Sequence, residues 1–213
     1  MSVAGSIGVP QTRTEGLFGR VMALVALTVA AATVGVWAAR DSGGTGWFVA
    51  WLAAIGCLIG LNVANSRGRS GLAVLLLLAF GLLVGVSVAG TIAYYAATDP
   101  TAVRQAFAAT TLSVAGLGSF GYATRRDLSA LYRLAFWLLL ALLAAGLLLI
   151  FVRIPGAYLA YTLFGLAVFG LYTVLDFNRL RRAGAEEAIP LAAGIFLDVL
   201  NIFLLFLRLF QRG

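Results

Sequence analysis

The chain has 213 residues, of which 62% are hydrophobic and 11% charged, and its mean hydropathy is +1.01. Soluble domains are usually about 45–50% apolar, so this composition excludes a soluble protein and predicts an all-α integral membrane protein. All fifteen basic residues are Arg. The absence of Lys and His excludes Schiff-base chemistry, a Ser-His dyad and His-ligated haem.

The chain begins with a polar stretch, residues 1–16, which we expect to be a disordered cytosolic tail. Residues 17–213 then form one membrane domain. It contains seven apolar segments of about 20 residues, the length needed to cross a hydrocarbon core of about 30 Å. These segments are 17–39, 47–64, 71–97, 102–122, 128–151, 156–177 and 189–210. The fourth is the least hydrophobic of them.

The distribution of Arg predicts the orientation of these seven spans. Ten of the fifteen Arg fall on the amino-terminal side of the layout and five on the other. By the positive-inside rule the amino terminus is inside. Seven crossings put the carboxyl terminus outside, and a final segment that enters and leaves on one side is the alternative. The richness in Ala, Gly and Arg without Lys suggests a GC-rich bacterial genome and hence a bacterial cytoplasmic membrane.

The last segment carries Asp198 near its middle, and Asn201 follows three residues later on the same helical face. An Asp at the centre of a spanning helix costs about 2.5–3.5 kcal/mol on insertion scales, so it normally faces a bundle interior, a cavity or a partner. We therefore expect this seventh helix to lie inside a ring made by the other six. The alternative is that Asp198 and Asn201 only hydrogen-bond to other helices and hold the bundle together.

A second acidic residue, Asp176, lies near the end of the sixth segment, three residues before Arg179. It could be an interfacial residue paired with a neighbouring Arg. Because the sixth and seventh segments are consecutive and antiparallel, it could also meet Asp198. Two carboxylates in a poorly solvated site cannot both ionise cheaply, so such a pair would hold a proton near neutral pH. With so few oxygen ligands it would pass Ca²⁺ transiently rather than store it.

Two further patterns are structural. Asp127, after Arg125 and Arg126, is placed to cap the helix that follows. Two pairs of glycines have the four-residue spacing that lets helices approach closely, namely Gly56 with Gly60 and Gly81 with Gly85.

Three stretches resemble the Bax inhibitor-1 family of small seven-span membrane proteins: GYATRRDLSAL, GLYTVLDFNRLRR and IPLAAGIFLDVLNIFLLFLRLF. The opening LFGRVMALVALTV is also similar to the family's first helix. The resemblance implies six helices around a central seventh and a pH-dependent calcium leak gated by an aspartate pair, which matches Asp176 and Asp198. It also implies a basic residue on the second span that latches the closed state by pairing with the aspartates. Arg67 is the nearest candidate, although Asn65 can occupy that position instead.

We therefore expect a pH-sensitive calcium leak channel, not an enzyme, with Asp176, Asp198 and Asn201 along the ion pathway. We expect Asp176 and Asp198 to contact Ca²⁺ transiently, and Arg67 to be the latch. We expect no cofactor and no nucleic-acid partner. The partners are the lipid bilayer, Ca²⁺, protons and a possible membrane protein. The alternatives are a proton-coupled transporter and a regulatory membrane protein that binds a protease or another partner in membrane stress and quality control.

Overall fold

The computed structural model describes residues 12–41, 46–152 and 155–211. Within these residues the chain forms seven α-helices and one short 3₁₀ segment, and no strand. They are α1 (Thr12–Ala39), α2 (Gly46–Ser66), α3 (Ser70–Thr98), α4 (Pro100–Ala123), α5 (Leu131–Phe151), α6 (Ala157–Leu180), η1 (Ala185–Glu187) and α7 (Ala188–Phe210). The all-α prediction is confirmed. Most of the predicted tail lies outside the described residues, and α1 already begins at Thr12.

Six of these helices are long and apolar enough to cross a membrane, namely α1, α2, α3, α5, α6 and α7 with η1. The remaining helix, α4, does not meet this condition of length and hydropathy. It corresponds to the predicted fourth span, the least hydrophobic of the seven. It begins where Asp99 caps it, since the carboxylate accepts from the backbone N–H of Ala102 at 2.9 Å and Pro100 occupies the first turn.

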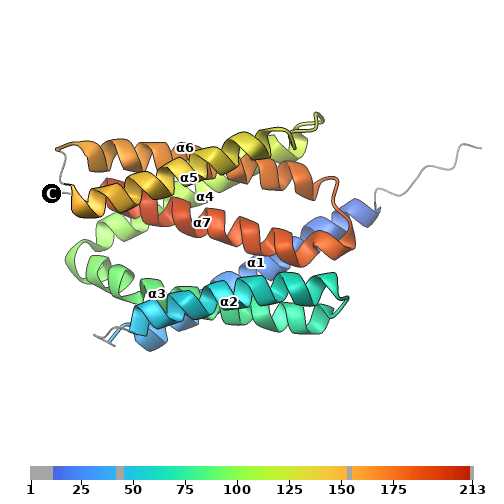
Figure 1. The fold of residues 1–213 in the computed structure, drawn as a ribbon, viewed down its shortest axis with the longest axis horizontal. Coiled ribbons are helices and arrows are strands. Elements are labelled where there is room, and N and C mark those ends of the chain that lie inside the picture. The colour runs from blue at the N-terminus through green and yellow to red at the C-terminus, as the bar shows by residue number, and fades with distance from the viewer. Residues whose placement is uncertain (1–11, 42–45, 153–154, 212–213) are drawn as a thin grey trace, which may run out of the picture.

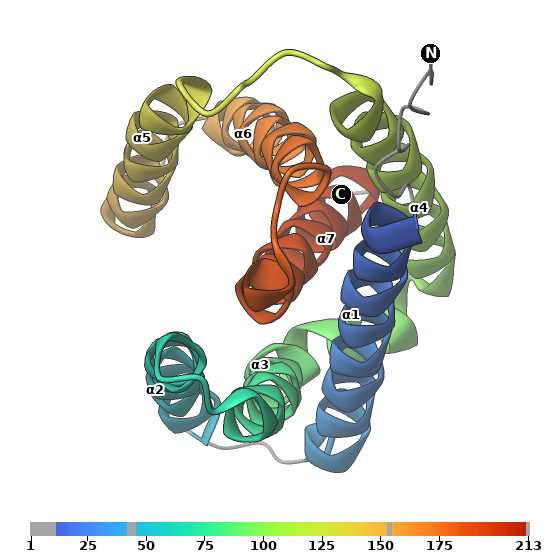
Figure 2. The ribbon, with the colours of Figure 1, turned by 90° about the vertical axis from the view of Figure 1, so that its right-hand side faces the viewer.

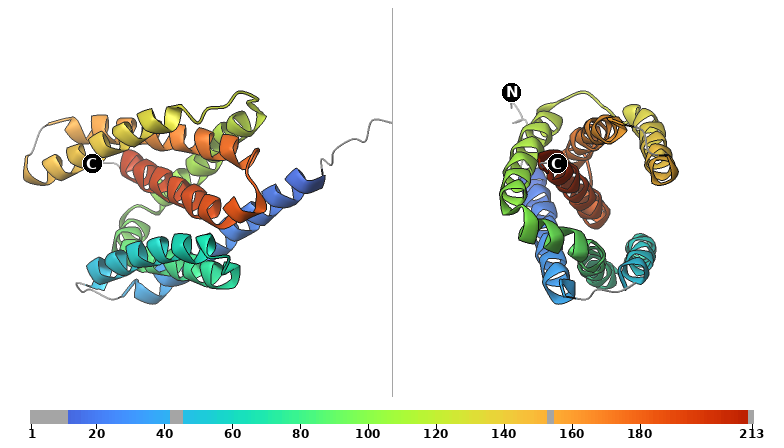
Figure 3. Two further views of the ribbon diagram at one scale, coloured as in Figure 1. Left: turned by 45° about the vertical axis from the view of Figure 1, so that its right-hand side comes forward. Right: turned by 90° about the vertical axis from the view of Figure 1, so that its left-hand side faces the viewer.

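The helices form two groups (Figure 1). In one group α3 packs against α1 and α2, and in the other α6 packs against α4 and α5. Few contacts join α3 to α4 directly. The helix α7 packs against α6, α4 and α1, with smaller contacts to α2 and α3, and lies between the groups when viewed end-on (Figures 2 and 3). It therefore connects the two halves of the bundle.

Close helix contacts depend on glycine in both groups of helices. A Cβ at Gly85 would overlap the carbonyl oxygen of Ala32, so α1 and α3 touch through their backbones. In the other group a Cβ at Gly121 would overlap the carbonyl oxygen of Val174, which joins α4 to α6 in the same way. The prediction of a close approach is thus confirmed for Gly85 and for Gly81, where a Cβ would lie 2.7 Å from the carbonyl oxygen of Thr28. It is wrong for Gly56, where an added Cβ would meet no atom within 4 Å.

The linker between α4 and α5 differs from its prediction. The helix α5 begins at Leu131, not at 128, because residues 127–130 form a turn. Asp127 accepts a hydrogen bond from the backbone N–H of Ser129 at 2.8 Å, so it stabilises this turn and does not cap the helix. Hydrogen bonds from Ser129 and Arg182 keep the pKa of Asp127 below its ordinary value.

Candidate functional site

Asp176 is buried on α6, with 8% of its surface exposed. Its Oδ1 accepts a hydrogen bond from the phenol of Tyr132 on α5 at 2.8 Å. Its Oδ2 faces α7 at Gly194, where an added Cβ would lie only 2.5 Å away. The carboxylate of Asp176 is therefore held between a tyrosine hydroxyl on one side and the backbone of α7 on the other.

Asp198 lies four residues after Gly194, which places both on the same face of α7. It is 5% exposed, and its Oδ2 is buried without a hydrogen-bond partner among the described residues. The two aspartates interact electrostatically. The carboxylate of Asp176 thus touches α7 one turn before Asp198, and the antiparallel packing of α6 on α7 brings the two residues into one region.

The groups around the two carboxylates are mostly neutral. Tyr132 and Tyr172 interact electrostatically with both aspartates, and their rings meet with centroids 6.5 Å apart. Arg179 is the cation nearest to Asp176 along α6, but its side chain forms an ion pair with Glu187 at 2.5 Å. The interpretation of Asp176 as an interfacial residue in an ion pair with a neighbouring Arg is therefore wrong for Arg179.

Asn201 does not extend this cluster. Its side chain is half-buried, and the Nδ2 donates to the carbonyl oxygen of Leu197 in its own helix at 2.8 Å. Such a bond satisfies the amide locally.

Arg67 is exposed in the turn between α2 and α3 and forms none of the ion pairs found in the described part of the chain. The side chain that links this end of α2 to the start of α7 is that of Asn65. Its Nδ2 donates to the carbonyl oxygen of Glu186 at 2.8 Å. Neither latch position considered from the sequence forms a hydrogen bond or an ion pair with Asp176 or Asp198 among the described residues, and Asn65 instead joins α2 to the segment before α7.

A cavity of about 420 Å³ opens beside Asp176 at the end of the bundle where α6 ends and α7 begins. It is lined by Asp127, Ser129, Tyr132, Arg179, Arg182, Ala183 and Glu187. Two ion pairs lie along its wall, Arg179 with Glu187 and Arg182 with Asp127 at 2.7 Å. Tyr132 both lines this cavity and donates to Asp176, so its side chain lies between the cavity and the buried carboxylate.

Sequence reasoning missed Tyr132 and also Asn178. The latter is 1% exposed, and its amide donates to the carbonyl oxygens of Gly121, Thr124 and Arg126 at 3.2, 2.9 and 3.2 Å. Its Oδ1 accepts from the backbone N–H of Leu128 at 3.2 Å. Asn178 thus holds the α4–α5 linker beside the cavity. The signal was a second polar residue two positions after Asp176 in an apolar segment.

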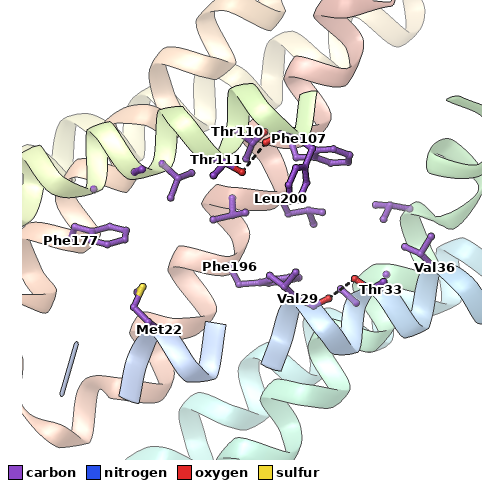
Figure 4. A pocket seen from close by; sticks show the side chains of 18 of the residues that line it. Met22, Val29, Thr33, Val36, Phe107, Thr110, Thr111, Phe177, Phe196 and Leu200 are labelled. Carbon is purple, nitrogen blue, oxygen red and sulfur yellow. Dashed lines mark hydrogen bonds between the residues drawn. The ribbon is translucent and has the colours of Figure 1, made fainter. Parts of the chain in front are cut away.

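A larger cavity lies elsewhere and is apolar. It has a volume of about 920 Å³ and runs between α1 and α4, with α7 along its floor (Figure 4). No acidic or basic side chain lines it.

Within the described ranges no cluster of three or more Asp, Glu, Cys or His side chains could hold a metal ion. The chemistry of the site is therefore that of two carboxylates and two tyrosines.

The chain is similar to a known family and to several curated proteins. Residues 14–213 match the family model described as inhibitor of apoptosis-promoting Bax1. An uncharacterized protein of Campylobacter jejuni, Cj0236c, is 30% identical over 109 residues, which are 51% of this chain and 47% of that protein. The Golgi anti-apoptotic protein of vaccinia virus strain Lister is 32% identical over 114 residues, covering 53% of this chain and 48% of the viral protein.

A third relative is the inner membrane protein YbhL of Escherichia coli K12, which is 28% identical over 130 residues. These are 56% of this chain and 54% of YbhL. The chain thus spans about half the length of the curated relatives it matches. The family model covers nearly the whole chain, and the six apolar helices agree with an integral membrane location. The chain belongs to the Bax inhibitor-1 family.

Proposed function

We propose that this protein is a pH-sensitive calcium leak channel of the Bax inhibitor-1 type, gated by Asp176 and Asp198. The observation that carries the proposal is the burial of both carboxylates at the contact of α6 with α7, with Asp198 Oδ2 left without a partner among the described residues. A buried carboxylate pair without a paired cation favours a shared proton. Loss of that proton would leave two charges that either separate the helices or attract a cation.

The neighbouring cavity supports a route to the pair. Since Tyr132 lines the cavity and donates to Asp176, protons and Ca²⁺ would reach the carboxylates past its hydroxyl. The charged and titratable groups that face the pair are Tyr132 from α5 and Tyr172 and Arg179 from α6. Because Arg179 is engaged by Glu187, it leaves the pair free to interact with a permeating ion.

The remaining topology belongs to the same proposal. In this topology α4 also crosses the membrane, which brings the number of spans to seven. The other six helices surround a central α7, and the amino terminus is inside. Contacts of α7 with helices of both groups support the central position, and the excess of Arg on the amino-terminal side supports the orientation. The E. coli relative is named an inner membrane protein, which favours a bacterial cytoplasmic membrane for this chain.

The proposed activity needs no cofactor, no nucleic acid and no catalytic residue. Ca²⁺ is the transported ion, touched transiently by Asp176 and Asp198, with Asn201 further along the pathway. A proton-coupled transporter that uses the same carboxylates would instead move a substrate against its gradient.

A second candidate is a regulatory membrane protein that acts by binding a protease or another membrane protein. The name of the vaccinia relative, a Golgi anti-apoptotic protein, favours this class. The candidate makes a different prediction for the aspartates, because a binding function at the protein surface would survive their loss.

The deciding experiment is Ca²⁺ influx into proteoliposomes between about pH 6 and about pH 8, the range in which a shared proton of a buried pair can leave. Wild type is compared with Asp176→Asn and Asp198→Asn. Asp41→Asn is the matched control, since the Asp41 side chain is 88% exposed and paired with Arg40. We expect a pH-dependent flux that either buried substitution alters and the control leaves unchanged. A flux that is absent or indifferent to both substitutions would favour the regulatory candidate.

A further inference from the structure

The α1–α4 groove, the apolar cavity of about 920 Å³ described above, is separate from the aspartate pair and needs its own explanation. It is lined by Phe18, Met22, Val29, Thr33, Phe107, Thr111 and further apolar residues of α3, α6 and α7. At one end Phe18 of α1 meets Tyr122 of α4 edge to face, with ring centroids 5.2 Å apart. At the other end Phe107 is 68% exposed. The groove is closed at the first end and open to its surroundings at the second.

The length of the groove fits one hydrocarbon chain. Along α4 it runs from Phe107 to Tyr122, which is about 22 Å at 1.5 Å per residue. One leaflet contributes about half of a hydrocarbon core of about 30 Å. The groove is longer than one leaflet is deep, so an acyl chain of the surrounding leaflet can be held within it from the open end.

The threonine hydroxyls in the groove are already satisfied. The hydroxyls of Thr33, Thr110 and Thr111 donate to carbonyl oxygens in their own helices at 2.9, 2.7 and 2.9 Å. The groove thus offers these hydroxyls to no ligand, and Phe196, Leu200 and Phe203 form an apolar floor on α7. A ligand without hydrogen-bonding groups fits such a lining.

A positively charged residue, Arg104, lies near the open end of the groove. Arg104 precedes Phe107 by three residues and shares its helical face. Its guanidinium donates to the hydroxyl of Thr101 at 3.3 Å and forms none of the ion pairs in the described ranges. The nearest carboxylate in the sequence, Asp99, accepts from the backbone N–H of Ala102. Arg104 is therefore placed to bind an anionic group outside the groove.

We propose that the α1–α4 groove binds one membrane phospholipid, with an acyl chain along α4 and the phosphate of the headgroup on Arg104. The apolar lining selects the chain, and the guanidinium at the open end selects an anionic headgroup over a zwitterionic one. A bound lipid fills the space that separates α1 from α4 beyond the Phe18–Tyr122 contact. This site is independent of the calcium leak and of the aspartates.

The test is native mass spectrometry of the full chain released from nanodiscs of equal parts phosphatidylglycerol and phosphatidylcholine. Wild type should retain one phospholipid and prefer phosphatidylglycerol about fivefold, the factor for about 1 kcal/mol per basic residue at an anionic surface. Ala115→Phe places a ring in the groove and should lower retention about tenfold or more. Leu112→Phe is the matched control, because Leu112 is 74% exposed and lies outside the lining.

The headgroup is tested separately. Arg104→Gln should keep the bound lipid and remove the preference, while Arg69→Gln, in the distant α2–α3 turn, should keep both. Ser119→Leu, at another exposed lining position, repeats the groove test if Ala115→Phe does not fold, as judged by thermal unfolding. Equal retention by the groove variants and wild type would overturn the proposal. So would a dimer by light scattering that Ala115→Phe dissociates, since the groove would then hold a second copy.

Discussion

Gly194 is where α7 comes closest to the carboxylate of Asp176, and replacing it tests the geometry of the pair. A Cβ at this position would lie 2.5 Å from Asp176 Oδ2, whereas ordinary contacts begin at 3.4 Å, so Gly194→Ala requires a shift of about 0.9 Å. The carboxylate cannot yield freely. Its side chain is buried, and its other oxygen is held by Tyr132 at 2.8 Å.

The expected loss of stability follows from two opposing effects. Overpacking a tight contact costs about 1–3 kcal/mol, and Ala is favoured over Gly inside a helix by about 1 kcal/mol. The net destabilisation is therefore about 0–2 kcal/mol relative to wild type, and about 1–3 kcal/mol relative to a Gly→Ala variant that gains helix propensity without the clash. For a chain of this size 1 kcal/mol corresponds to about 2–4 °C, so the melting temperature should fall by up to about 8 °C below wild type and lie about 2–12 °C below that of such a control variant.

The assay is thermal unfolding in detergent together with Ca²⁺ flux in proteoliposomes. Gly116→Ala and Gly90→Ala are matched controls, because a Cβ at either position meets nothing within 4 Å. They should melt at or slightly above the wild-type temperature. If Gly194→Ala melts with the controls and keeps the wild-type flux at every pH, the close contact between Asp176 and α7 is refuted.

Three further substitutions test the surroundings of the pair. Asn178→Ala should destabilise the protein by about 2–4 kcal/mol in the same unfolding assay, because buried carbonyl oxygens of the α4–α5 linker lose their donor. Tyr132→Phe should cost about 1–2 kcal/mol and alter the pH dependence of the flux, whereas Tyr172→Phe, for which no hydrogen bond to Asp176 is seen, should do neither. The pKa of Asp127 is lower in the folded protein than in the unfolded chain. The stability from its ion pair with Arg182 is therefore fully present above the ordinary pKa of an Asp carboxyl, and it is lost as the pH falls through the lowered pKa of the folded state. Hydrogen exchange of the linker should therefore quicken only in acid, and Asp127→Asn should remove that acid dependence.

The sequence predicts the parts of this structure that depend on local composition. The apolar segments give the helices to within a few residues, and the cost of an Asp in a membrane predicts the burial of Asp198. The predicted start of α5 is three residues early because the turn at Asp127 depends on Ser129 and on Arg182, which lies far along the chain in the turn after α6.

Contacts between distant residues could not be predicted in this way. Tyr132 and Asp176 are 44 positions apart, and no helical period relates them. The choice of Glu187 as the partner of Arg179 depends on the path of the short segment between α6 and α7. The α1–α4 groove is defined by how far apart two helices lie, which composition does not encode. These features follow from packing, in which many apolar surfaces compete for the same contacts.

The position of α7 between two groups of helices has a consequence for biogenesis. During synthesis α7 follows the other six helices, so the α1–α3 and α4–α6 groups enter the membrane before the helix that connects them. Until then Asp176 has no neighbour at Gly194, and the two groups are held together by few contacts. Arrival of α7 completes the fold and the aspartate pair in one step. A nascent chain stalled before α7 should therefore be a preferred substrate for membrane proteases.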